Sequence, residues 1–159
     1  MIDQFCISDV LLDSIKEVFE TMIFMSVAKG EDQETRITGD TFLGTITFKG
    51  EIEGCLGICL GEDCARTVSA NMLCIDDPAE VSDEDLADAI GEIANMVMGS
   101  VKTRLQEEMP HLEISIPSVI CGRVLKSNLG DATLKERLIV KIDQYDVELN
   151  FSCRAAGNV

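Results

Sequence analysis

The pattern of hydrophobic and polar residues is most regular between residues 82 and 102, where it predicts a helix with two unlike faces. One face repeats apolar side chains every three or four residues, as a buried helical stripe requires: Leu86, Ile90, Ile93, Ala94, Val97 and Val101. The opposite face carries polar or small residues at the same spacing: Asp88, Glu92, Asn95 and Gly99. Asn and Gly both disfavour a helix interior, Gly by up to about 1 kcal/mol relative to Ala. This second face is therefore either an ordinary exposed surface that tolerates them or a surface kept for a partner.

Both ends of this helix are marked in the sequence. Ser82 precedes three acidic residues and can serve as the N-cap, with Asp85 at the third position of a capping box. Val81 and Leu86 flank the cap and can form a hydrophobic staple. Pro110 ends the helix at the latest, because proline disfavours helical backbone in the residue before it.

The first part of the chain predicts another helix and then a hairpin. Ser8 can cap this helix, which would run to near Gly30. Its apolar stripe consists of Leu11, Ile15, Phe19 and Met22. Alternating residues then predict a set of strands, and a short helix from residue 61 follows them. The predicted strands are residues 36–38, 44–49 and 52–60, with a turn at residues 49–51.

The last part of the chain predicts further strands. Residues 112–116 and 118–121 form two of them, separated by Pro117, and residues 132–142 and 145–153 form an antiparallel pair. Strand pairs follow one another closely and alternate with long helices. The fold class is therefore α+β, a mostly antiparallel sheet packed against long helices.

The order of elements also predicts the domain organisation. Residues 1–153 form one domain, and residues 154–159 form a loose tail. Each half of the chain is a long helix followed by a hairpin, which suggests an internal duplication. In such a duplication residues 17–20 would take the place of residues 92–95.

Composition and charge exclude several classes of function. The chain of 159 residues is 46% hydrophobic, and it has neither an apolar run that could span a bilayer nor a recognisable signal peptide, so a cytoplasmic protein is expected. The formal charge of −16 argues against nucleic acid and against anionic membranes as partners. The same charge suits a basic patch on a partner protein, although acidity can also serve solubility alone.

The reactive side chains predict no catalytic centre or metal site of the usual kinds. The seven cysteines form no C-x-x-C pair, and most stand among apolar neighbours, so we expect reduced cysteines in the core and no metal site. His111, the only histidine, follows Pro110 in a predicted loop and is expected at the surface. No motif for a nucleophilic serine, a phosphate-binding loop or a zinc protease is present.

A resemblance to a known family gives the polar face a function. The pattern Asp88-x-x-x-Glu92-x-x-Asn95, followed by Gly99, resembles the active-site helix of the CheC/CheX/FliY family of chemotaxis phosphatases. Three more segments are similar to that family: residues 14–22, 54–60 and 114–122. Only one Glu-x-x-Asn motif is present, as in CheX proteins, whereas CheC-type members usually carry two. The resemblance therefore implies a CheC-like fold, a CheX-like domain and a homodimer.

The resemblance also implies a reaction and a role for each residue. The substrate is a phosphorylated response regulator of the CheY type, which supplies the aspartyl phosphate and its Mg²⁺, so the chain needs no cofactor of its own. Asn95 would orient the attacking water, and Glu92 would pair with a lysine near the phosphoryl group. The partner surface would include four more residues: Asp88, Gly91, Met96 and Gly99.

Two other functions remain open at this point. The same fold family includes flagellar switch proteins that bind partners without catalysis, and on that interpretation the helix is only a contact surface. An acidic module that docks on a basic partner is the other alternative. A structural relative has no need of Asn95 beside Glu92, so this asparagine distinguishes the phosphatase from both alternatives.

Overall fold

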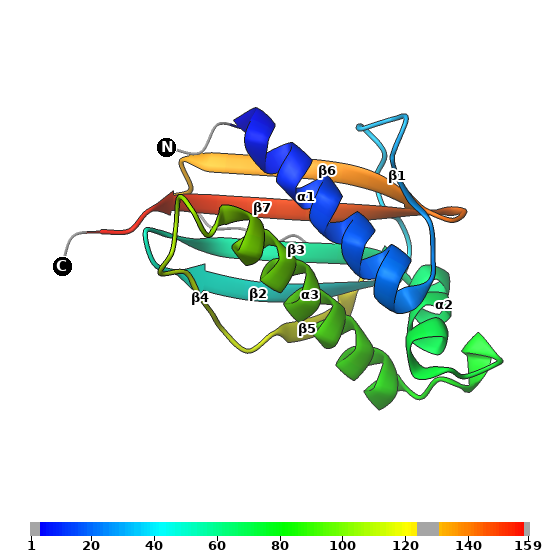
Figure 1. Ribbon diagram of the computed structural model, residues 1–159. Coiled ribbons are helices and arrows are strands. Elements are labelled where there is room, and N and C mark those ends of the chain that lie inside the picture. The colour runs from blue at the N-terminus through cyan, green and yellow to red at the C-terminus, as the bar shows by residue number, and fades with distance from the viewer. Residues whose placement is uncertain (1–3, 124–130, 158–159) are drawn as a thin grey trace.

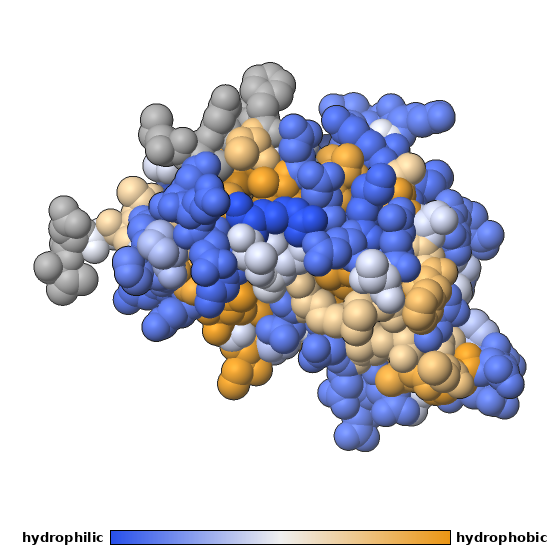
Figure 2. Space-filling view, viewed as in Figure 1, coloured by the Kyte–Doolittle hydropathy of each residue, from blue (hydrophilic) through white to orange (hydrophobic). Residues whose placement is uncertain are grey.

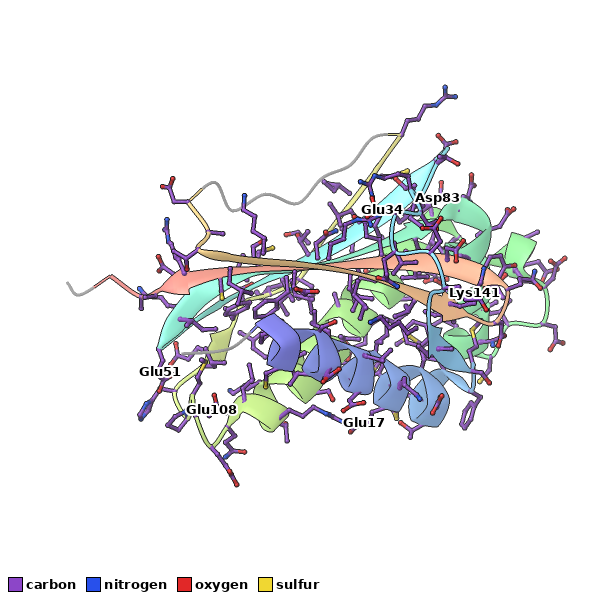
Figure 3. The ribbon with its side chains drawn as sticks, turned by 90° about the horizontal axis from the view of Figure 1, so that it is seen from above. Glu17, Glu34, Glu51, Asp83, Glu108 and Lys141 are labelled. Carbon is purple, nitrogen blue, oxygen red and sulfur yellow. The ribbon has the colours of Figure 1, made fainter. Side chains whose placement is uncertain are left out.

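The computed structural model describes residues 4–123 and 131–157, and in it two long helices lie across one face of an antiparallel sheet (Figures 1 and 3). These helices are α1 (Gln4–Val18), which continues into the π-helical turn η1 (Phe19–Ile23), and α3 (Asp83–Leu105). The shorter α2 (Glu62–Leu73) and the turn η2 (Pro78–Glu80) lie between them in sequence. This arrangement confirms the predicted α+β class.

Within the described residues the sheet has seven strands, and every pair of these is antiparallel. Its order is β1-β6-β7-β3-β2-β4, with β5 also paired to β2. The strands are β1 (Val27–Lys29), β2 (Thr41–Lys49), β3 (Ile52–Gly61), β4 (Glu113–Ile114), β5 (Ser118–Gly122), β6 (Leu134–Ile142) and β7 (Tyr145–Ala155).

The topology repeats itself, as the predicted duplication requires. The first half runs α1, β1 and the hairpin β2–β3, and the second half runs α3, the short strands β4 and β5, and the hairpin β6–β7. The short strands of each half pair with the first hairpin strand of the other half, and β3 pairs with β7 at the centre. The helices α1 and α3 therefore occupy corresponding places in the two halves.

The core lies between the two helices and the sheet. It includes Phe48 of β2 and Phe151 of β7, whose rings stack with centroids 5.1 Å apart. Gly44 lets α3 pack closely on β2, because a Cβ atom there would lie 3.0 Å from Ile90 Cγ2. A side chain at this position would push α3 away from the sheet, so Gly44 helps to set the position of the candidate helix.

The first helix differs from its prediction at both ends. It begins at Gln4, so Ser8 lies within the helix and is not its cap. It ends at Ile23, where Phe24 takes a left-handed conformation (φ 61°) and its backbone N–H bonds to the Phe19 carbonyl. The chain then forms β1 where a helix to Gly30 was expected, and Met22 is exposed, outside the apolar stripe.

Two further boundaries also differ from prediction. Residues 36–38 are a loop, and the stretch just before them is held to β6 by a side chain, since Arg137 donates to the carbonyls of Gln33 and Thr35. The C-terminal tail starts later than expected, since Arg154 and Ala155 belong to β7. Arg154 pairs with Glu53 of β3 at 2.7 Å, which fixes it to the sheet. Residues 158–159 of the predicted tail lie outside the described residues.

Candidate active site

The start of α3 is held as its sequence predicts. The Asp85 backbone N–H donates a hydrogen bond of 3.1 Å to Ser82 Oγ, which confirms the N-cap. Val81 and Leu86 are both buried, in agreement with the hydrophobic staple. Arg66 of α2 adds a second attachment, since it donates to the Val81 carbonyl (2.9 Å) and pairs with Asp83 (3.2 Å). The N-terminal turn of α3 is thus fixed against α2.

The two faces of α3 have opposite environments. The predicted apolar stripe is buried throughout: Leu86, Ile90, Ile93, Ala94, Val97 and Val101. We call the opposite face, made of Asp88, Glu92, Asn95 and Gly99, the polar ridge. The side chains of Asp88, Glu92 and Asn95 are exposed, and a Cβ atom at Gly99 would have nothing within 4 Å. Burial of the stripe therefore keeps the ridge turned toward solvent on a rigid helix.

The polar groups of the ridge have no partner within the described part of the chain. The side chains of Asp88, Glu92 and Asn95 make no hydrogen bond or ion pair with any of those residues. All three side chains project from a helix whose position is fixed by its packing on the sheet. An exposed carboxylate and a carboxamide one turn apart can thus contact another molecule without first breaking an internal bond.

One flank of the ridge is formed by the segment around β5. Gly91 is buried there, and a Cβ atom on it would lie 3.5 Å from Val119 Cγ2 and 3.6 Å from Pro117 Cγ. Gly91, which the sequence analysis assigned to the partner surface, is thus covered by residues of its own chain. The glycine inside a helical pattern was the sequence signal for this close approach, but it did not say which segment approaches.

The other flank of the ridge faces α1. Ser100 donates to Glu17 Oε2 at 3.2 Å, and Arg104 pairs with the same oxygen at 2.6 Å. The hydrogen bond from Arg104, with a further one from Ser100, lowers the pKa of Glu17. Met96 precedes Ser100 by one turn, so it lies on this flank, where it is half-buried against the core.

The other reactive groups of the described residues lie outside the ridge and form no comparable site. Cys59, Cys64 and Cys153 are buried as expected, and burial raises the pKa of the Cys64 thiol to about 12. The other cysteines differ from the core prediction, since Cys6, Cys74 and Cys121 are exposed and Cys55 is half-buried. His111 is at the surface as predicted, with Nδ1 2.7 Å from Glu51 Oε1.

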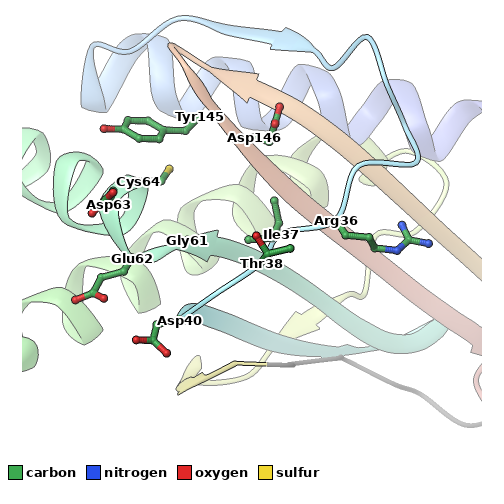
Figure 4. A pocket seen from close by; sticks show the side chains of 10 residues that line it. All are labelled: Arg36, Ile37, Thr38, Asp40, Gly61, Glu62, Asp63, Cys64, Tyr145 and Asp146. Carbon is green, nitrogen blue, oxygen red and sulfur yellow. The ribbon is translucent and has the colours of Figure 1, made fainter.

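A cavity of about 450 Å³ opens where the loop before β2 meets the start of α2 and the β6–β7 turn (Figure 4). Its lining includes the carboxylates of Asp40, Glu62, Asp63 and Asp146, with Arg36 as the one cation of the lining residues. None of the lining residues belongs to α3. The candidate chemistry of the ridge is therefore separate from this cavity.

Solved structures of CheX and CheC-like proteins share the fold described above. The CheX crystal structure from Desulfovibrio desulfuricans matches with a TM-score of 0.79 at 22% identity, over 93% of this chain and 99% of that one. The chain in a CheX–CheY–BeF₃–Mg²⁺ complex from Borrelia burgdorferi matches with a TM-score of 0.65 at 21% identity, over 97% and 99%. These similarities establish a CheC-like fold.

Sequence comparison then identifies the family. The family model "Chemotaxis phosphatase CheX" matches residues 42–140, which include all of α3. The CheY-P phosphatase CheX of Thermotoga maritima is 30% identical over 112 residues, covering 70% of this chain and 71% of that protein. The chain belongs to the CheX family, as the resemblance of its polar ridge indicated. Within the described residues, we find no helix with the length and apolar character needed to cross a membrane.

Proposed function

We propose that this protein hydrolyses the aspartyl phosphate of a phosphorylated CheY-type response regulator by inserting the polar ridge of α3 beside the phosphoryl group. The observation that carries the proposal is the pair Glu92 and Asn95, exposed one turn apart on a fixed helix and without a bonded partner among the described residues. The Thermotoga maritima relative is named as a phosphatase of phosphorylated CheY, which supports the choice of substrate.

Asn95 orients the attacking water in this mechanism. Phosphoryl transfer depends mainly on in-line positioning and charge stabilisation, so the protein need not form a covalent bond to the substrate. A carboxamide suits this task because its oxygen accepts a hydrogen bond while its nitrogen donates one, which fixes a water in two directions. It is too weak a base to remove a proton, so its role is orientation alone.

Glu92 fixes the register of docking. One turn before Asn95 on the same face, its carboxylate pairs with a lysine near the phosphoryl group of the regulator. Loss of water at the interface strengthens this pair relative to an ordinary surface ion pair. Asp88 extends the acidic rim toward the start of the helix, Met96 supplies an adaptable apolar contact, and Gly99 lets the backbone of the partner approach.

The metal ion of the reaction belongs to the regulator. Mg²⁺ bound beside the aspartyl phosphate would neutralise the charge that develops on the phosphoryl group, while this chain orients the attacking water. The Borrelia burgdorferi complex named above contains CheX, CheY, BeF₃ and Mg²⁺, which supports a ternary arrangement of this kind. The acidic ridge faces the partner's lysine and holds no ion of its own.

We further propose that the protein acts as a homodimer in the cytoplasm. Membership of the CheX family supports the dimer, and buried thiols at Cys59, Cys64 and Cys153 suit a reducing compartment. Light scattering on the purified protein should give twice the chain mass of 17.4 kDa. A mass equal to one chain across the micromolar range would rule the dimer out.

The direct test of the activity uses a CheY-type regulator from the same organism. The regulator is phosphorylated in the presence of Mg²⁺, and loss of its phosphoryl group is followed with and without this protein. We expect dephosphorylation well above spontaneous decay. An unchanged decay rate, together with tight binding to the regulator, would favour the non-catalytic interaction module.

A further inference from the structure

An exposed apolar surface lies beside the polar ridge and has no role in the proposed chemistry. Large apolar side chains are exposed at five positions of the described chain, and three of these belong to neighbouring elements: Met22 (59% exposed), Phe24 (82%) and Leu73 (41%). Met22 lies in η1, Phe24 follows it, and Leu73 ends α2, which packs against η1. We call these three residues the apolar patch. Figure 2 shows a hydrophobic area where η1, α2 and α3 meet.

The conformation of Phe24 is hard to explain by folding alone. It takes the left-handed conformation that ends the first helix, with φ 61°. Gly or Asn is the usual residue at such a position, because a larger side chain is strained there. Burial could offset the strain, but Phe24 is the most exposed member of the patch. Its aromatic ring therefore contributes little to stability and is available to another molecule.

The patch lies on the flank of the ridge that faces α1. Ser100 bonds to Glu17, so the side of α3 that carries Ser100 and Met96 is turned toward the end of α1, which continues into η1. The opposite flank is closed by Pro117 and Val119 over Gly91. Half-buried Met96 lies on this flank, and α2 packs against both α3 and η1, so the patch and the ridge belong to elements in contact.

The ridge alone is too small to form a whole protein interface, and this favours the regulator as the molecule that covers the patch. A stable complex covers about 800 Å² on each partner, whereas the ridge from Asp88 to Gly99 is one helix edge about 16 Å long. A regulator whose phosphoryl group reaches Asn95 must rest on one flank as well. The η1 side offers Phe and Met side chains, which are enriched at the centres of interfaces.

We propose that Met22, Phe24 and Leu73 form a second docking surface for the same response regulator, which binds them through an uncharged apolar face beside its phosphorylation site. This inference rests on the proposed function and names how the partner is held. The ridge orients the attacking water and fixes the register of docking, and the patch adds apolar contact area. Binding should therefore depend on side chains that have no part in hydrolysis.

The test measures binding without turnover. The regulator is loaded with Mg²⁺ and BeF₃⁻, which mimics the phosphoryl group, and its Kd is measured for the wild type and for the double variant Met22→Ala/Phe24→Ala. We expect the Kd to rise at least about tenfold. Both side chains are more than half exposed, so the melting temperature should stay unchanged. If the double variant melts early, Phe24→Ala alone serves as the test, with an expected rise of threefold or more.

The experiment also includes a matched control variant and a variant on the other flank of the ridge. Ile120→Ala removes an exposed apolar side chain from the opposite face of the sheet, since its neighbour Val119 faces α3, and should leave the Kd within twofold. Ile116, which is 89% exposed before Pro117, represents the other flank. An unchanged Kd in the double variant, or a loss caused only by Ile116→Ala, would overturn the proposal.

Three further outcomes distinguish this inference from the alternatives. If the double variant changes the dimer mass but not the Kd, the patch contacts a second copy of this chain and the proposal is wrong. If the wild type fails to dephosphorylate the regulator, the proposed function fails even when binding follows the pattern above. Normal dephosphorylation by the wild type with an unchanged Kd in the double variant overturns only the docking surface.

Discussion

The helices α1 and α3 occupy corresponding places in two halves of similar topology, yet they use their polar residues in opposite ways. On α1, Glu17 is bound by Ser100 and Arg104, and in its continuation η1, Glu20 accepts a hydrogen bond from the Val27 backbone at 3.4 Å. On α3, Glu92 and Asn95 have no such partners among the described residues. The glutamates of the first helix thus stabilise the fold, whereas Glu92 and Asn95 of α3 remain available to another molecule.

The two helices also differ in chemical capability. In the duplication suggested by the sequence, Glu20 takes the place of Asn95. A carboxylate only accepts hydrogen bonds, so Glu20 could not fix a water in two directions as a carboxamide does. Glu17 is likewise engaged by α3 itself, which lowers its availability to a lysine from outside. The structure thus supports one active ridge per chain.

Reversing the charge of Glu92 should give the largest effect on docking. Glu92→Lys places a cation against the lysine of the regulator, and like charges in a desolvated contact are strongly unfavourable. We expect the Kd for the Mg²⁺–BeF₃⁻ regulator to rise at least about 100-fold. Asp13→Lys makes the same change of charge at an exposed position of α1 and should alter the Kd less than threefold. Equal losses in both variants would mean that net charge, not the ridge, governs docking.

The two glycines of α3 should separate helix stability from docking. Replacement by alanine favours the helix by up to about 1 kcal/mol at either position. Gly91→Ala adds a methyl in ordinary contact with Val119 and Pro117, so it should raise the melting temperature without changing the Kd. Gly99→Ala should raise the melting temperature too, but weaken docking several-fold, because its methyl points into open space on the ridge. A Gly99→Ala variant with wild-type affinity would remove Gly99 from the contact.

The bond between the two helices should give the smallest effect, and it depends on pH. The pKa of Glu17 is lowered chiefly by the hydrogen bond from Arg104, so its contribution is fully present above the ordinary carboxyl pKa. That contribution is lost as pH falls through the lowered pKa. Glu17→Gln should therefore cost about 0.5 kcal/mol at pH 7, as for other exposed ion pairs. The difference from wild type should shrink below pH 4.5, as denaturation curves at several pH values would show.

Much of the fold could be predicted because local signals agree with the final packing. The cap at Ser82, the apolar stripe of α3 and the hairpin β2–β3 all rest on residues close together in sequence. The same holds for the polar ridge, whose members share one face of one helix. A periodic pattern therefore sufficed to bring Glu92 and Asn95 together.

The predictions that differ from the structure concern contacts between segments far apart in the sequence. The first helix ends early at Phe24, which carries no glycine or proline signal, and β1 forms because β6, more than 100 residues later, is there to pair with it. Gly91 is covered by Pro117 and Val119, which periodicity on α3 alone could not reveal. The exposure of Met22 follows from the π-helical turn, which shifts it away from the stripe.

The most direct test of the account replaces Asn95 by alanine and measures two quantities on one regulator. Asn95→Ala should abolish dephosphorylation above spontaneous decay, because no other group of the ridge can fix the water. Its Kd for the Mg²⁺–BeF₃⁻ regulator should rise no more than about fivefold, since Glu92 and the apolar patch remain. Full activity in Asn95→Ala would contradict the oriented water, and with it the proposed mechanism.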